Sequence, residues 1–386
     1  MLDLLTNEEK SNTKTCLKFI SHIDDSKLSF FDYRGLNDAN RYLFTFSQIR
    51  SYGLVKKRCV LINKQRKYNK IAIGYINNPD FQAYAEYQDN YYFIEISACI
   101  PAIIQSLFSI LAIRGNPFLL SEDVLGRTPI FSNRSILFPL NIHDITAKYS
   151  DASQSIKHFF EFQPIPPKKQ QFQFSSALSS LAIIYCINHE LGHVMCGHTL
   201  RLFEVRNTQL SVIGGTIKKE IRQAWELEAD RSAFLSMIDF SFNNRYVADW
   251  LRKSFQLNST DTLLHLIRYI VFSVCFVLFL FGQYDFDIVS RSHHPSITVR
   301  VCNMILSIRQ LCCVPKFGFT EEQVTKEVQL GFEIAQKTWQ RFGLQQGIEE
   351  TETSWEQGFE ELSKLYIIME NDRTEYKRYN WAYSNL

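Results

Sequence analysis

Residues 189–193 read HELGH, and they close a segment whose apolar residues recur at intervals of three and four. This periodicity predicts a helix that carries the whole string. Residues four apart share one helical face, so His189 and His193 can reach a single ion while Glu190 projects beside them. Two imidazoles and an adjacent carboxyl in this arrangement are typical of a catalytic zinc site.

A catalytic zinc ion uses three protein ligands and keeps a fourth position open. Residues 225–233 read WELEADRSA, within a second predicted helix at about residues 218–239. Glu226 and Asp230 share a face there, so Glu226 is predicted as the third ligand, and Asp230 accepts the second N–H of a ligating histidine. Glu228 is turned about 200° from Glu226, and we expect it toward solvent. His198 faces away from His189 if the first helix continues, and is expected to be structural.

The remaining pattern predicts an α+β fold. Residues 78–85, a turn at 88–90 and a β-rich run at 91–97 form a hairpin, and we expect the strand at 92–97 to be a sheet edge that can pair with an extended substrate. A helix at 102–113 ends at a Gly-Asn-Pro stop. Ser175 or Ser176 is expected to cap the helix that carries HELGH.

Two amphipathic helices are predicted near the C-terminus, at residues 320–344 and 354–369, the first opened by a capping box of Thr320 and Gln323. We divide the chain into an N-terminal helical and irregular region at 1–55, a core at 56–313 and a C-terminal helical region at 314–386.

Residues 269–282 contain no charge. A membrane span needs about 20 apolar residues, and a shorter run is more often a buried helix. The length therefore favours a core helix over a membrane helix, and no membrane span is expected.

The formal charge of +2, from 42 Lys and Arg against 40 Asp and Glu, gives no global attraction to nucleic acid. The basic stretch at 56–70 is interpreted as a solvated β-hairpin, with a nucleic-acid patch as the alternative. Nine scattered cysteines without a C-x-x-C pair favour a reducing compartment, and the first ten residues lack the pattern of a secretory signal. We expect a cytoplasmic protein with no nucleic-acid partner.

HELGHVMCGH followed by ELEADRSA resembles the gluzincin metallopeptidases, in particular the group around the CAAX prenyl endopeptidases and their soluble relatives. HPSITVR at 294–300 is similar to the H-P-x-x-x-x-R stretch of that group, and residues 78–85 resemble its edge hairpin, from which Pro79, Asp80 and Gln82 depart. The Lit-type peptidases of phage exclusion are another group that the chain resembles. The resemblance covers about residues 78–304 and implies a zincin-type core with a small sheet against the helices.

The resemblance implies Zn²⁺ held by His189, His193 and Glu226, with Glu190 as general base and Asp230 behind the ligands. His294 or Arg300 could stabilise the oxyanion or order the site, and His293 competes for that role. The sequence thus predicts a zinc metalloendopeptidase acting on a protein or peptide. Two alternatives remain: a defence effector protease with one host target, and an inactive zinc-stabilised module that binds a partner.

Overall fold

The computed structural model describes residues 70–76, 82–88, 91–115, 117–118, 165–209, 217–243, 245–257, 263–281, 294–313, 317–342 and 352–375. The described elements, in chain order, are β1 (Lys70–Ile76), β2 (Ala83–Gln88), β3 (Tyr91–Ser97), α3 (Cys99–Arg114), α7 (Lys169–Met195), α8 (His198–Gln209), α9 (Lys219–Asn243), α10 (Arg245–Ser254), the 3-10 helix η4 (Leu263–His265), α11 (Leu266–Phe281), α12 (Ile297–Cys312), α13 (Glu321–Arg341) and α14 (Glu352–Glu375).

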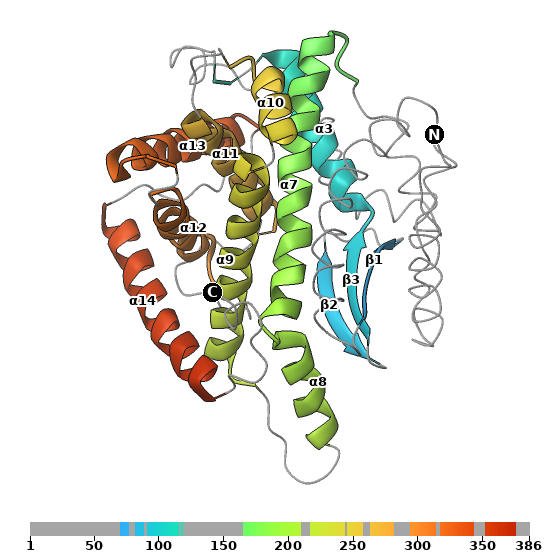
Figure 1. The fold of residues 1–386 in the computed structure, drawn as a ribbon, viewed down its shortest axis with the longest axis vertical. Coiled ribbons are helices and arrows are strands. Elements are labelled where there is room, and N and C mark those ends of the chain that lie inside the picture. Colours follow the sequence, from blue (N-terminus) through green and yellow to red (C-terminus); the bar gives the residue numbers. More distant parts are fainter. Residues whose placement is uncertain are drawn as a thin grey trace.

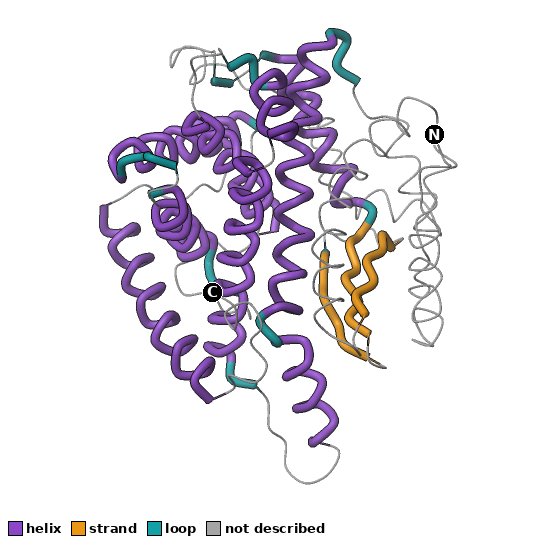
Figure 2. The backbone as a smooth tube through the Cα atoms, in the orientation of Figure 1, coloured by secondary structure: helices purple, strands orange, loops and turns teal. Residues whose placement is uncertain are grey.

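The predicted α+β fold is confirmed, because a small sheet packs against a mainly helical body (Figure 2). Helix α7 lies between the sheet on one side and α9, α12 and α14 on the other (Figure 1). The predicted region at 1–55, most of the basic stretch at 56–70 and residues 78–81 of the hairpin lie outside the described residues. The division of the chain at residues 55 and 313 stays a prediction.

The sheet has the order β1-β3-β2. The predicted hairpin is confirmed, since β2 pairs antiparallel with β3. The expectation that the strand at 92–97 is an edge is wrong: β1 pairs in parallel with its other side, from Lys70 against Tyr91 to Ile76 against Ser97. Both faces of β3 are buried, with Ile94 at 0% and Glu95 at 3% exposure. The edge beside α7 and α8 is therefore β2.

Helix α7 begins earlier than expected. It starts at Lys169, where the side chain of Gln171 accepts the backbone N–H of Lys168 at 3.3 Å. Ser175 and Ser176 lie buried inside the helix and do not cap it. The apolar residues of α7 are buried on all sides, because α3, the sheet and α9 all pack against it.

The uncharged segment forms a core helix. Residues Leu263–Phe281, which combine η4 and α11, are long and apolar enough to cross a membrane by length and composition, but 83% of their most apolar 18-residue window is buried inside the protein. Phe276 packs against Phe108 of α3 and against Trp339 of α13. The apolar surface of α11 is thus covered by the chain's own helices, as predicted.

The two C-terminal helices pack on the rest of the helical body, α13 on α11 and α12, and α14 on α9 and α12. Helix α13 begins with the predicted capping box, in which Thr320 and Gln323 bond each other's backbone N–H. Helix α14 packs on α9 and α12, where Leu362 and Leu365 join a buried cluster with Leu227 and Val299.

Candidate active site

Two helices bring the site together through unusually close packing. Helix α7 supplies His189, Glu190 and His193, and α9 supplies Glu226 and Asp230. The two helices approach closely at Gly192, where an added Cβ would lie only 2.9 Å from both Cα and O of Ala229. Gly192 and Ala229 are therefore the residues that let the two helical faces meet.

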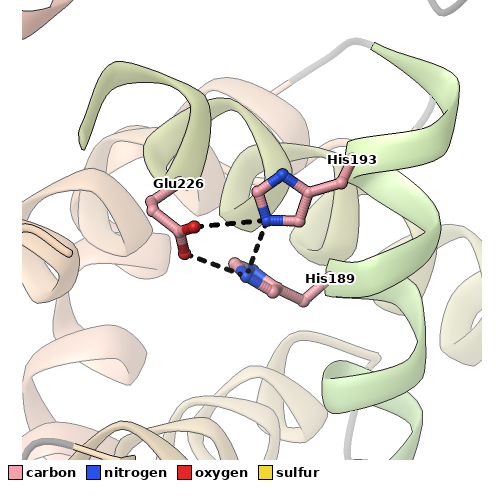
Figure 3. A group of neighbouring side chains, drawn as sticks. All are labelled: His189, His193 and Glu226. Carbon is pink, nitrogen blue, oxygen red and sulfur yellow. Dashed lines mark hydrogen bonds and ion pairs between the residues drawn. The ribbon is translucent and has the colours of Figure 1, made fainter. Parts of the chain in front are cut away.

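His189, His193 and Glu226 form a compact triangle of ligand-type atoms (Figure 3). Nε2 of His189 lies 3.2 Å from Oε2 of Glu226, and Nε2 of His193 lies 3.4 Å from Oε1. The two Nε2 atoms are 3.3 Å apart. All three predicted ligands thus converge on one point between α7 and α9.

These separations fit a tetrahedral metal ion. Nitrogen and oxygen ligands lie about 2.0–2.1 Å from Zn²⁺, so neighbouring ligand atoms of a tetrahedral site are about 3.3 Å apart. The two Nε2 atoms are separated by this distance, 3.3 Å, and each of them lies 3.2 or 3.4 Å from a different oxygen of the Glu226 carboxylate. The donor set of two imidazoles and one carboxylate is compatible with a metal ion.

A buried carboxylate holds the far side of His189. Nδ1 of His189 lies 2.8 Å from Oδ1 of Asp230, which is fully buried. Arg300 donates to both oxygens of Asp230, at 2.9 and 2.7 Å, and Tyr185 donates its hydroxyl at 2.5 Å. Burial disfavours the charged form of Asp230, but Arg300 and His189 outweigh it and hold its pKa well below the ordinary range. Asp230 therefore remains a carboxylate that orients His189 through Nδ1.

The two histidines differ in their electrostatics. Burial lowers the pKa of His193 to about 3 despite the charge of Glu226, so its imidazole is neutral. Burial acts in the same direction on His189, but hydrogen bonds and charges from Asp230 and Glu226 outweigh it and raise the pKa to about 10. A metal ion at this point must displace a proton from His189, so higher pH favours its binding.

A cavity of about 490 Å³ opens beside these residues. Its lining comes from the β2 edge, α7, α9, the end of α11 and the start of α12, and includes Gln82, Ala83, Tyr84, Tyr185, Cys186, His189, Glu190, Glu226, Phe281, His294, Pro295, Ile297 and Arg300. Glu190 is 6% exposed. Burial raises its pKa to about 7, although the positive charges nearby oppose the shift. A carboxyl with this pKa can take up and release a proton near neutral pH.

His294 and Arg300 lie at the site in different ways. His294 is exposed at the cavity, and its Nδ1 lies 3.0 Å from Oε2 of Glu226, whose negative charge raises the pKa of His294. Arg300 is 5% exposed and its guanidinium is engaged by Asp230. This contact favours the ordering alternative for Arg300 over a direct role at an oxyanion. His293 lies outside the described residues.

Glu228 and His198 do not lie where the sequence placed them. Glu228 is 2% exposed, so the expected solvent position is wrong, because α9 is packed between α7, α12 and α14 and offers no open side there. Its Oε2 lies 3.1 Å from Nε2 of His198. The premise for His198 also fails: α7 ends at Met195, and the chain turns at Gly197, with φ 80°, before α8 begins.

Two residues of the site escaped the sequence analysis. Tyr185 lies four residues before His189, and that spacing placed it on the same face of the helix. Trp225 stacks on His198 with ring centroids 4.9 Å apart and an interplanar angle of 7°. Glycine after a helix commonly marks its end, so Gly197 could have indicated that the chain turns before His198. This turn is what allows His198 to contact His193.

Comparison with known proteins supports a peptidase. Residues 149–310 match the model of the family Peptidase U49, a Lit-like protease family, and this span contains α7 to α11 and most of α12. It includes the site residues of these helices but not the β2 edge of the cavity. No curated protein and no solved structure matches the chain. On the family match, the protein is a peptidase, a hydrolase whose substrate is a protein or peptide, and the chain resembles Peptidase U49 over the helices that carry the site.

Proposed function

We propose that the protein is a zinc-dependent metalloendopeptidase in which Glu190 is the general base. The observation that carries the proposal is the convergence of His189, His193 and Glu226, whose nitrogen and carboxylate oxygen atoms lie close enough together to bind one metal ion. A metal ion bound between these three groups would take the place of the proton that His189 otherwise shares with Glu226. Two histidines and one carboxylate, with an open fourth position, are the donor set of catalytic zinc in peptidases.

A bound Zn²⁺ would polarise the scissile carbonyl and lower the pKa of a water molecule toward 7. Glu190 lies next to His189 in the chain and lines the same cavity. With a pKa of about 7 it takes the proton of the attacking water and then delivers a proton to the leaving amine. One carboxyl thus serves both proton transfers.

The edge strand β2 supports a mode of substrate binding. Gln82, Ala83 and Tyr84 line the cavity together with Glu190, and of the strands that the structure describes none pairs with the outer side of β2. An extended peptide that adds to a sheet edge is held by main-chain hydrogen bonds, whatever its side chains. We propose that the substrate binds along β2, which corrects the earlier assignment of this role to the strand at 92–97.

His294 is proposed to stabilise the oxyanion of the tetrahedral intermediate. Its imidazole is exposed at the cavity, and the negative charge of Glu226 raises its pKa, which favours the protonated form that can donate to an oxyanion. Arg300 is proposed as a positioning residue, because its guanidinium fixes Asp230, which in turn orients His189. Asp230 and Arg300 thereby affect the reaction only through the position of the metal ligand His189.

The proposal is tested with Glu190→Gln, which removes the base and leaves the three proposed ligands unchanged. We expect about one zinc per chain in both proteins by elemental analysis, and loss of proteolysis in the variant. Glu356→Gln, at an exposed position of α14, is the matched control and should cleave as the wild type does. Normal turnover by Glu190→Gln would contradict the mechanism, and joint loss of zinc and activity would mean that Glu190 is misassigned.

The substrate is sought by comparing new protein N-termini in cells that express the wild type or Glu190→Gln. Cleavage of many proteins would support a general endopeptidase. A single cleaved host protein would support the effector alternative. A wild type that binds zinc and produces no new N-terminus would support an inactive binding module instead.

A further inference from the structure

We propose that His198 and Glu228 are positioning residues that fix the tautomer of His193, so that its Nε2 lone pair faces the metal. The inference rests on the proposed zinc site. It adds a second carboxylate that helps to orient a ligand, besides Asp230, which orients His189. It concerns two residues that the sequence had placed outside the site.

The contacts form a chain from a carboxylate to a ligand. Oε2 of Glu228 lies 3.1 Å from Nε2 of His198, and Nδ1 of His198 lies 3.0 Å from Nδ1 of His193. His193 then presents its Nε2 to His189 and Glu226. Each ring nitrogen of His198 and His193 therefore has a partner at hydrogen-bond distance.

Only one arrangement of protons on two neutral rings satisfies this chain. A carboxylate can only accept, so Glu228 requires the proton of His198 on Nε2, and Nδ1 of His198 is left as an acceptor. The facing Nδ1 of His193 must then carry the proton and donate it. Nε2 of His193 is left with its lone pair, which is the form that binds a metal.

The surroundings hold His198 in this orientation. The side chains of His198 and Glu228 are 5% and 3% exposed. The imidazole of His198 stacks on Trp225 at 4.9 Å, and Nε1 of Trp225 donates to Asp372 of α14 at 2.9 Å. Arg201 lies over the Trp225 ring at 5.1 Å and also pairs with Asp372. The His198 imidazole therefore cannot flip, which would swap the positions of Nδ1 and Nε2, without breaking its packing on Trp225.

Each ligating histidine then has its own carboxylate on α9. Asp230 orients His189 directly, and Glu228 orients His193 through His198. Partners behind metal ligands commonly set metal affinity, and their loss costs about 10- to 100-fold.

A second metal ion is the competing explanation, because ligand atoms of Cys196, His198 and Glu228 lie within 4.8 Å of one another. The short contacts favour the hydrogen-bonded chain, since both nitrogens of His198 are already engaged, one by His193 and one by Glu228. A second ion would have to displace the proton between His198 and Glu228. Cys196→Ala separates the two explanations, because it removes a ligand of that second ion and leaves the chain intact.

The test compares His198→Phe, His198→Asn, Glu228→Gln and Cys196→Ala with the wild type. Phenylalanine keeps a flat ring on Trp225 and removes both nitrogens. Asparagine loses the stacking but can place an acceptor near the position of Nδ1. A role in packing alone therefore predicts more damage from His198→Asn, whereas a role in fixing the tautomer predicts more damage from His198→Phe.

The measurements are zinc per chain, zinc affinity by competition with a chelator, and the visible spectrum of the Co²⁺-loaded protein. Thermal unfolding without added metal reports folding separately. We expect one zinc per chain and unchanged affinity in Cys196→Ala, and affinity reduced about 10- to 100-fold in His198→Phe. His198→Asn and Glu228→Gln should fall between these two, with an altered Co²⁺ spectrum in each His198 variant.

Wild-type zinc affinity in His198→Phe and Glu228→Gln would overturn the inference while leaving the proposed function intact. Two zinc ions in the wild type and one in Cys196→Ala would overturn it in favour of a second metal site. A wild type that binds no zinc would overturn the proposed function and this inference together. If His198→Phe does not fold, the comparison of His198→Asn and Glu228→Gln with Cys196→Ala decides the question.

Discussion

The close contact at Gly192 yields a prediction in which stability and metal binding respond differently. In Gly192→Ala the new Cβ would meet Cα and O of Ala229 at 2.9 Å. Carbon atoms in ordinary contact are about 3.5–4.0 Å apart, so α7 and α9 would have to separate by about 0.6 Å or more. Both atoms belong to the backbone of α9, and no side-chain rotation can relieve the contact.

The cost in stability should be modest. Forcing an extra methyl group into a packed interior costs about 1–3 kcal/mol, whereas replacing glycine by alanine inside a helix gains about 1 kcal/mol. The net loss in the free energy of unfolding is therefore about 0–2 kcal/mol. Metal binding should suffer more, because His189 and His193 move with α7, Glu226 moves with α9, and metal–ligand distances tolerate only about 0.2 Å. We expect zinc affinity to fall about tenfold or more.

The assay combines urea unfolding without metal and competition for zinc with a chelator. Gly331→Ala is the matched control, because a Cβ there would lie 2.5 Å from O of Arg268, between α13 and α11, which carry none of the proposed ligands. This variant should lose stability and keep its zinc affinity. A folded Gly192→Ala protein with wild-type zinc affinity would refute the argument that this contact sets the ligand geometry.

Three other positions give further predictions. Arg300→Met removes the guanidinium that bonds both oxygens of the fully buried Asp230 and should cost about 3–5 kcal/mol in urea unfolding. An unchanged unfolding midpoint would contradict the pairing of Arg300 with Asp230. Burial raises the pKa of Glu95 from 4.5 to about 7, so the folded state holds this proton more tightly, and a contribution of about 3 kcal/mol, present below pH 4.5, is lost as the pH rises to about 7. Glu95→Gln should flatten that part of the stability profile, and an unaltered slope would exclude Glu95 as its source. Asp372→Ala removes the hydrogen-bond acceptor of Trp225 and should lower the free energy of unfolding by about 1–3 kcal/mol. The zinc affinity, measured by competition with a chelator, should fall several-fold. Unchanged stability and zinc affinity would show that α14 does not support the metal site.

Much of the site could be predicted because helical geometry is local. The spacing of four between His189 and His193, and again between Glu226 and Asp230, places each pair on one face whatever else the chain does. The two helices approach closely where Gly192 of α7 meets Ala229 of α9, and both residues are small. The sequence also located α9, α13 and the hairpin of β2 and β3 to within a few residues.

The misplaced parts depend on contacts between distant segments. Strand β3 is an inner strand because β1 pairs in parallel with the side that β2 does not occupy. No turn sequence joins β1 directly to β3, so the local pattern does not reveal this pairing. A helical wheel gives the direction in which Glu228 points from α9. It does not show that other helices cover that side of α9 and bury Glu228. The position of His198 depended on a single break in the helix at Gly197, where the φ of 80° suits glycine.

The three acidic residues of α9 show why the break in the helix matters. Glu226 and Asp230 face the ligating histidines of α7, whereas Glu228 points about 200° away from Glu226 around α9. The turn at Gly197 brings His198 to that other side, within 3.1 Å of Glu228, while His198 still contacts His193 at 3.0 Å. A continuous helix would have left Glu228 as a buried charge without this partner. The histidine at position 198 therefore gives the buried carboxylate at position 228 a partner at hydrogen-bond distance, and through His193 it connects that carboxylate to the proposed ligands.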